Sequence, residues 1–314
     1  MKVTEHLDRA QRTLFSYEII PPKRGGSLQD IIGMVEQVAH LEPPFIDVTS
    51  HAAEAIYEEA ADGTIRRQVR KKRPGTLSIC GIIQNRWNID TVPHLLCAGF
   101  TREETEDAVI ELNYLGIQNV LAVRGDASKR GRRPDPHRTR NRTAADLVTQ
   151  LDNLRHGQYL EELEGSAPVD LCVGVGGYPE KHFEAPNLKT DIQRLKDKVD
   201  AGADYVVTQM FFDNQVFFEF ERRCREAGIT VPIIPGLKLL DHARQLANLP
   251  RHFHVTLPEA LADEVAAHPE HAAEIGQRWA LGQVMDLVNR GVPCIHFYVM
   301  NDASPVAQLI QDLD

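Results

Sequence analysis

The sequence predicts a single (β/α)8 barrel that occupies residues 1–314 as one domain. Three observations support this fold. Eight short apolar runs alternate with segments of helical periodicity, which is the pattern of parallel strands joined by helices. Several of these runs end in polar or charged residues, as strands do at the active face of such a barrel. No internal repeat or shift in composition marks a boundary for a second domain.

The eight predicted strands are short and mostly continuous in apolar character, because parallel strands in this fold are buried on both faces. They are Leu14–Ile20, Phe45–Thr49, Val92–Cys97, Asn119–Gly125, Asp170–Gly176, Tyr205–Phe211, Pro232–Gly236 and Cys294–Val299. Strand and helix alternate throughout, so the sheet should be parallel with right-handed crossovers.

Apolar residues at helical spacing predict helices between the strands. The segments Ser27–Leu41 and Asn187–Ala203 each place apolar residues on one face. Thr101 with Glu104 three residues later is a capping-box pattern, which predicts the start of another helix.

The segment Thr76–Trp87 fits either a ninth strand or a helix. We expect a helix, because Pro74-Gly75-Thr76 is typical of a turn and a cap, and because the strand count then closes at eight. Two basic stretches, residues 66–73 and 127–142, are expected in the connections after the second and fourth strands.

The composition is typical of a soluble cytoplasmic protein. Hydrophobic residues make up 42% of the chain and charged residues 25%, which is enough apolar material for a large core. The five cysteines are dispersed without a CxxC pair, as in reduced intracellular proteins. There is no apolar secretory segment, and no run approaches the ~20 apolar residues of a membrane span.

Charge and residue spacing argue against two classes of function. The net charge of −10 disfavours a general nucleic-acid binder, and the basic loop 127–142 lacks aromatic residues for base stacking. We interpret that loop as a lid over a polyanionic ligand, with a merely solvated loop as the simpler alternative. The histidine pairs His252/His254 and His268/His271 have no cysteine or carboxylate in a metal-binding pattern, so no metal site is expected.

Glu18 is the strongest catalytic candidate. It lies at the end of the first strand, just before Pro21-Pro22, so its carboxyl group should lie at the mouth of the barrel. Its apolar neighbours imply partial burial, which favours the protonated carboxyl group that a general acid needs at pH 7. The alternative is a structural carboxylate that caps a turn or pairs with a lysine.

The tripeptide Arg124-Gly125-Asp126 directly follows the apolar part of the fourth strand. Glycine lets the backbone approach a flat ligand closely, and the flanking residues supply opposite charges. A structural ion pair between Arg124 and Asp126 explains the same pattern equally well.

Two further strand ends carry weaker signals. The run Gly174-Val175-Gly176-Gly177-Tyr178 is not a dinucleotide-binding GxGxxG motif, and we interpret it as close packing of backbone on a ligand. His182 follows in a loop, where a lone histidine is usually just solvated. Gln209 ends an apolar strand, where its amide needs hydrogen-bond partners and suits the donor and acceptor edge of a heterocycle.

In this order, the strand ends resemble the methylenetetrahydrofolate reductases of the bacterial MetF type along nearly the whole chain. The segments that carry the resemblance are Phe15–Pro22, Val92–Cys97, Asn119–Asp126, Gly177–Ala185, Leu195–Ala203, Val206–Asp213, Ile233–Gly236 and Ile295–Tyr298. Each segment alone is weak evidence for the family, but all of them in this order at successive strand ends are highly specific for it.

The resemblance implies a flavoprotein that binds FAD noncovalently at the carboxyl-terminal face of its barrel. NADH or NADPH would reduce the flavin and leave, and 5,10-methylenetetrahydrofolate would then receive the hydride and become 5-methyltetrahydrofolate. Glu18 would be the general acid that protonates the folate amine. Asp126 would lie by the flavin rim and the pterin, while Gln209 and Gln245 would hydrogen-bond the pterin. The implied FAD contacts are Thr49, His94, Arg124, Gly125, Asp126, Tyr178, His182, Asp191 and Lys198.

The chain departs from the family pattern at three places. Ser50 stands where many relatives have an aromatic residue, Thr143 where tyrosine is usual, and Asn301-Asp302 where Asn-Arg is common. That arginine helps to hold the folate tail in relatives, so we hypothesise that loop 127–142 attracts the glutamates of a polyglutamylated folate. The chain ends soon after the eighth strand, so a regulatory domain and inhibition by adenosylmethionine are not expected.

Two other functions remain open from the sequence. A related flavoprotein could act on another pterin or one-carbon carrier, which the altered tail residues support. A barrel without catalysis could bind RNA or a protein partner through its basic patches, but the joint presence of Glu18, Asp126 and Gln209 speaks against it. The sequence does not decide between NADH and NADPH, and a homo-oligomer is compatible with it.

Overall fold

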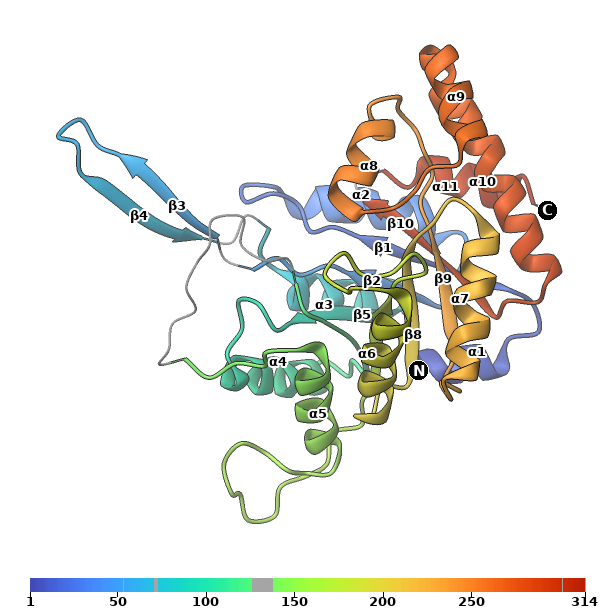
Figure 1. Ribbon diagram of the computed structural model, residues 1–314. Helices are drawn as coiled ribbons and strands as arrows, with labels where there is room; N and C mark the ends of the chain where they lie inside the picture. The colour runs from blue at the N-terminus through green and yellow to red at the C-terminus, as the bar shows by residue number, and fades with distance from the viewer. Residues whose placement is uncertain (53, 71–72, 126–137, 301, 314) are drawn as a thin grey trace.

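A closed barrel of eight parallel strands forms the centre of the protein, as the sequence predicts (Figure 1). The computed structural model describes residues 1–314 except 53, 71–72, 126–137, 301 and 314. Around the barrel the strand order is β1-β10-β9-β8-β7-β6-β5-β2. These strands are β1 Leu14–Ile19, β2 Phe45–Val48, β5 Asp90–Leu96, β6 Asn119–Val123, β7 Cys172–Gly177, β8 Tyr205–Met210, β9 Ile233–Leu237 and β10 Cys294–Met300.

Helices connect successive strands, and most of them pack around the outside of the barrel (Figure 1). They are α1 Val3–Arg9, α2 Leu28–Ala39, α3 Thr76–Trp87, α4 Arg102–Tyr114, α5 Ala144–Arg155, α6 Leu188–Asp200, α7 Asn214–Glu226, α8 Gln245–Phe253, α9 Glu259–Ala267, α10 Ala272–Asn289 and α11 Ser304–Gln311, with a 3-10 turn at Pro269–His271. The ambiguous segment Thr76–Trp87 is helical, as expected. The predicted capping box also forms, because Oγ1 of Thr101 accepts a hydrogen bond from the Glu104 amide and the Glu104 carboxylate accepts one from the Thr101 amide.

The connection after β2 contains an unpredicted hairpin. Strand β3 (Glu54–Glu59) pairs antiparallel with β4 (Ile65–Arg70), and the two project away from the barrel (Figure 1). The turn has a local cause: Gly63 has a φ of +78°, and Oδ1 of Asp62 accepts a hydrogen bond from the Thr64 amide at 3.0 Å. The register sets Glu58 opposite Arg66, so opposite charges replace the apolar alternation by which a strand is usually predicted.

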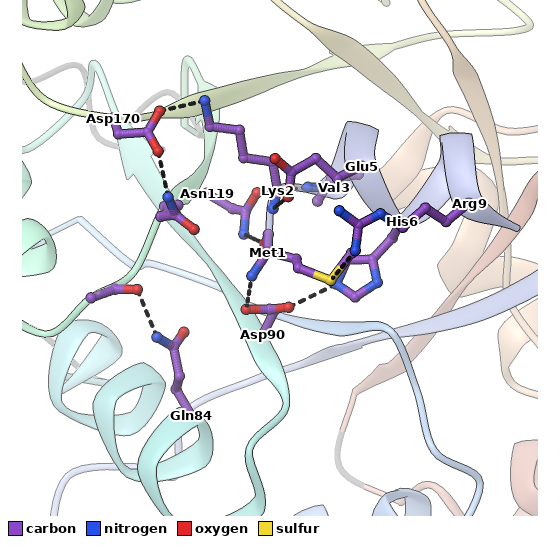
Figure 2. Close-up of polar contacts among 12 residues, drawn as sticks. Met1, Lys2, Val3, Glu5, His6, Arg9, Gln84, Asp90, Asn119 and Asp170 are labelled. Carbon is purple, nitrogen blue, oxygen red and sulfur yellow. Dashed lines mark hydrogen bonds and ion pairs between the residues drawn. The ribbon is translucent and has the colours of Figure 1, made fainter.

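Helix α1 closes the amino-terminal end of the barrel. Val3 and Leu7 pack among the apolar side chains inside the barrel. Figure 2 shows the polar contacts that hold this segment: the amino group of Met1 and Nε2 of His6 each lie 2.7 Å from the carboxylate of Asp90, at the start of β5. The Val3 amide also donates to Oδ1 of Asn119, the first residue of β6, at 2.8 Å. The opposite, carboxyl-terminal end is therefore the place for a ligand.

Candidate active site

Glu18 lies near the carboxyl end of β1, inside the mouth of the barrel. Its side chain is only 11% exposed. The parallel register sets it beside Asp47 on β2 and beside Tyr298 on β10. Side chains of alternate strand residues share one face, so Ser16 lies one layer deeper on the same side of β1 as Glu18.

Glu18 belongs to a cluster of buried acids and imidazoles. Nε2 of His94 lies 3.4 Å from Oε2 of Glu18 and also 3.4 Å from Oδ2 of Asp47. Nε2 of His296 lies 3.9 Å from Oε2 of Glu18, and the other ring nitrogen of His296 is 2.9 Å from Oγ of Ser16. Burial lowers the pKa of His94, but its contact with Asp47 and the charge of Glu18 outweigh burial, and the pKa is raised.

A second polar cluster lies where β7 and the following loop meet α6. Oδ2 of Asp191, in the first turn of α6, accepts a hydrogen bond from the His182 amide at 2.7 Å. The Lys198 ammonium donates to the carbonyl of Gly176. Burial lowers the pKa of Lys198 to about 8, although the nearby charge of Asp191 acts in the opposite direction. The ring of Tyr178 meets that of His182 edge to face, with centroids 4.8 Å apart.

The fourth strand contributes a cation and a tight turn to the same edge. Arg124 pairs with Glu184. Asp126 lies outside the described residues, so its predicted pairing with Arg124 stays a prediction. Gly125 has a φ of +78°, and a Cβ there would lie 3.3 Å from Cβ of Ala98. Glycine is therefore required by the backbone as well as by the narrow space.

The glycines of β7 have a different role from the one expected. A Cβ on Gly174 would lie 2.3 Å from the ring of Tyr205, so this glycine makes room for a tyrosine inside the barrel. A Cβ on Gly177 would lie 2.8 Å from Val206. Nothing lies within 4 Å of the corresponding position on Gly176. The interpretation that the backbone packs closely on a ligand is thus wrong for Gly174 and Gly177, which face other side chains of the protein. Of these three glycines, only Gly176 faces open space.

The two predicted pterin-binding glutamines lie where the sequence places them. Gln209 is in β8, and its Oε1 accepts a hydrogen bond from the Met210 amide at 2.9 Å. Gln245 begins α8, and its Oε1 accepts from the amides of Asp241 and His242 at 2.8 and 3.1 Å. In both residues the described contacts use the amide oxygen.

One predicted FAD contact, Thr49, and three residues around Glu18 complete the site. Thr49 follows β2, and its buried Oγ1 has no hydrogen-bond partner within the described residues. Three residues without a predicted role also lie around Glu18: Asp47, His296 and Tyr298. The charged residue in the otherwise apolar run Phe45–Val48 was the one available signal for Asp47.

No group of three or more His, Cys, Asp or Glu residues in the described part of the chain is arranged to hold a metal ion. Within the same residues, none of the helices has the length and apolar character to cross a bilayer.

Comparison with known proteins identifies the family. A family model described as "Methylenetetrahydrofolate reductase" matches residues 2–314. The chain is 30% identical over 291 residues to 5,10-methylenetetrahydrofolate reductase of Escherichia coli, which covers 92% of this chain and 86% of the relative. The corresponding protein of Pectobacterium carotovorum is 29% identical with the same coverage. A probable methylenetetrahydrofolate reductase (NADPH) of Caenorhabditis elegans is 27% identical over 98% of this chain, which spans 43% of that relative.

Among solved structures, the fold is shared by an uncharacterized protein from Clostridium thermocellum that binds two copies of 5-methyl-5,6,7,8-tetrahydrofolic acid. The TM-score is 0.60 at 12% sequence identity, and the match covers 99% of this chain and 98% of the other. The barrel and the family that the sequence predicted are both confirmed: the chain belongs to the methylenetetrahydrofolate reductases, a family of oxidoreductases.

Proposed function

We propose that the protein reduces 5,10-methylenetetrahydrofolate to 5-methyltetrahydrofolate with NADH or NADPH, in two successive half-reactions that share one noncovalently bound FAD. The observation that carries this proposal is the place of Glu18: an almost buried carboxyl group at the barrel mouth, 3.4 Å from an imidazole. Reduction of the folate needs an acid that acts on the folate alone, and a shielded carboxyl group suits that role.

The residues present fit FAD. The buried Oγ1 of Thr49 lacks a hydrogen-bond partner among the described residues, and the open space over Gly176 leaves room for a ligand beside β7. The Lys198 ammonium beside that space suits a phosphate or ribose. The other residues that would hold the cofactor are His94, Arg124, Gly125, Asp126, Tyr178, His182 and Asp191. When bound, FAD would supply two-electron hydride transfer between the nicotinamide and the folate.

In this proposal Glu18 donates its proton to the folate amine. Loss of the carbon–nitrogen bond opens the five-membered ring and leaves an iminium carbon that can accept hydride. Gln209, Gln245 and Asp126 hold the pterin, so that this amine faces Glu18. The nicotinamide and the folate then occupy the same site in turn, and only the folate needs the acid.

A steady-state assay tests this function. Under anaerobic conditions, purified protein loaded with FAD should oxidise NADH or NADPH over many turnovers only when 5,10-methylenetetrahydrofolate is present, and the product separated by chromatography should be 5-methyltetrahydrofolate. Comparison of the two nicotinamides in one assay gives the donor preference. Flavin reduction by the nicotinamide that is never followed by formation of 5-methyltetrahydrofolate would contradict the proposed substrate and favour another pterin.

The charge state of Lys198 predicts how FAD affinity depends on pH. Its pKa of about 8 means that the ammonium is charged below that pH and loses its charge as the pH rises above it. We therefore expect FAD to bind about 10-fold more weakly at about pH 9 than at about pH 7, since one charge-assisted contact is lost. Titration of the apoprotein with FAD, followed by flavin fluorescence, measures this.

Two variants separate this effect from general pH sensitivity. Lys198→Met should bind FAD weakly at neutral pH and show no further loss as the pH rises. Lys196→Met removes a lysine of the same helix that pairs with Asp200, and it should behave like the parent protein. A parallel pH dependence in the parent and in Lys198→Met would contradict the role given to Lys198.

We further propose that the basic loop 127–142 attracts the tail of a polyglutamylated folate. Arg132 and Arg133 lie outside the described residues, and Arg138 lies 2.9 Å from Glu104. An exposed arginine contributes little binding free energy alone, but the three together should matter. Replacing all three with alanine should therefore raise the KM for a triglutamate substrate by about 10-fold. The KM for the monoglutamate should not change. An unchanged KM and salt dependence for the triglutamate would overturn this proposal.

The cellular setting is also a proposal. The five dispersed, buried cysteines, none of them in a disulfide, support a cytoplasmic enzyme that supplies methyl groups for methionine synthesis.

A further inference from the structure

Asp47 is the most unusual buried group in the protein. It lies in β2 with a fully buried side chain, and neither carboxylate oxygen has a hydrogen-bond partner among the described residues. A buried carboxylate without a partner is costly, and natural proteins keep such groups next to a cation or for a functional reason. Its one described ion-pair contact is Nε2 of His94, at 3.4 Å.

The same nitrogen atom faces two carboxyl groups. Nε2 of His94 is equally distant, at 3.4 Å, from Oδ2 of Asp47 and from Oε2 of Glu18. These two acids come from neighbouring strands and are paired in the parallel register. A single N–H can donate well to only one of them at a time, so a proton on His94 can be directed to either carboxyl group.

Among the described titratable groups around Glu18, the imidazole of His94 is the nearest one that can carry a proton to it. The titratable groups that face Asp47 and His94 are Glu18 on β1, Cys80 on α3, Tyr205 on β8, and Cys294, His296 and Tyr298 on β10. Burial raises the pKa of both thiols and both phenols, so these four groups stay neutral. Nε2 of His296 lies farther from Glu18, at 3.9 Å.

We propose that Asp47 is a positioning residue that holds a protonated His94 beside Glu18 and thereby restores the acid after each turnover. This inference rests on the proposed function. Each folate reduced removes one proton from Glu18 and leaves a carboxylate. The N–H bond at Nε2 of His94 then breaks, and the proton moves to Oε2 of Glu18. Asp47 remains a carboxylate and stabilises the imidazolium again once solvent at the barrel mouth returns a proton to the ring. The raised pKa of His94 supports this assignment.

The first test compares the two half-reactions of Asp47→Asn by anaerobic stopped-flow. Reduction of the bound flavin by NADH should stay within about twofold of the parent rate, because this step does not use Glu18. The first reoxidation by 5,10-methylenetetrahydrofolate should also stay close to the parent rate, because it uses the proton already on Glu18. Steady-state turnover, which needs Glu18 to be protonated again in each cycle, should slow about 10-fold or more, and the high-pH limb of kcat should move to lower pH. The Kd for the folate, taken from the concentration dependence of the reoxidation rate, should stay unchanged, because a fully buried side chain cannot touch the substrate.

The second test needs no turnover. In protein labelled with ¹³C-histidine, the ring signal of His94 is assigned by its loss in His94→Asn. Its titration midpoint should fall by about one pH unit or more in Asp47→Asn, since an opposite charge in contact has been removed. Thr91→Val is the matched control, because it removes a fully buried polar group from the neighbouring strand without changing charge. It should leave the midpoint where it is.

The outcomes separate this inference from the proposed function. An equal slowing of both half-reactions, or an unchanged His94 midpoint, would overturn the role of Asp47. If Asp47→Asn does not fold, Asp47→Ser is used, and the same results are expected of it. A parent protein whose reduced flavin is not reoxidised by the folate would refute the proposed function instead, while the titration would still test the coupling of His94 to Asp47.

Discussion

Glu18→Gln should lose folate reduction while it keeps its flavin chemistry. The amide has nearly the same shape as the carboxyl group but cannot donate the proton that opens the folate ring. We expect the folate half-reaction to slow by about 10²- to 10⁴-fold, the usual contribution of a general acid. FAD binding and flavin reduction by the nicotinamide should change little, because neither step needs a proton from Glu18.

The two half-reactions are measured separately by absorbance of the bound flavin. Glu111→Gln, which makes the same change on an exposed residue of α4, is the control and should match the parent protein in both. A Glu18→Gln variant that still reduces folate at the parent rate would show that another group is the acid. Equal loss of both half-reactions would show that Glu18 shapes the site and does not act as an acid.

The second large effect is expected for stability. Gly174→Ala would place a Cβ 2.3 Å from the ring of Tyr205, whose side chain is fully buried. Neither group has space to move within a closed barrel, so we expect a loss of about 3 kcal/mol in the free energy of unfolding, or more. Thermal or denaturant unfolding measures it.

A second glycine of the same strand provides the control. Gly176→Ala meets nothing within 4 Å, so it should leave the free energy of unfolding almost unchanged. Its methyl group would enter the proposed flavin site, so FAD affinity should fall. In the double variant Gly174→Ala/Tyr205→Leu the smaller side chain should recover part of the lost stability. Equal stability of the two single variants would contradict this account of the barrel interior.

The alternation of strands and helices could be predicted because it depends on local signals. The helix Thr76–Trp87 was recognised from its cap and from the need for eight strands, and Thr101 from its capping box. The hairpin β3–β4 was missed because its strands carry charge pairs such as Glu58 and Arg66 in place of apolar alternation. The Asp62-Gly63 turn was the signal that could have revealed it.

The site was predictable only in part. The resemblance named residues that the structure brings together, such as Lys198, Asp191 and His182 at the β7–α6 edge. Asp47 could not be assigned from the pattern, because strands buried on both faces give no alternation to show which residues point into the barrel. Its importance depends on a register between β1 and β2 that only the folded barrel defines. The pairing of Arg124 with Glu184 likewise joins residues 60 positions apart.

We propose that one flavin on this barrel passes hydride from a nicotinamide to a folate. The most direct measurement is the visible spectrum of the FAD-loaded protein during an anaerobic titration, first with NADH and then with 5,10-methylenetetrahydrofolate. The flavin band should bleach with NADH and return in full with the folate. Bleaching that the folate does not reverse, or a protein that binds no FAD, would contradict this proposal.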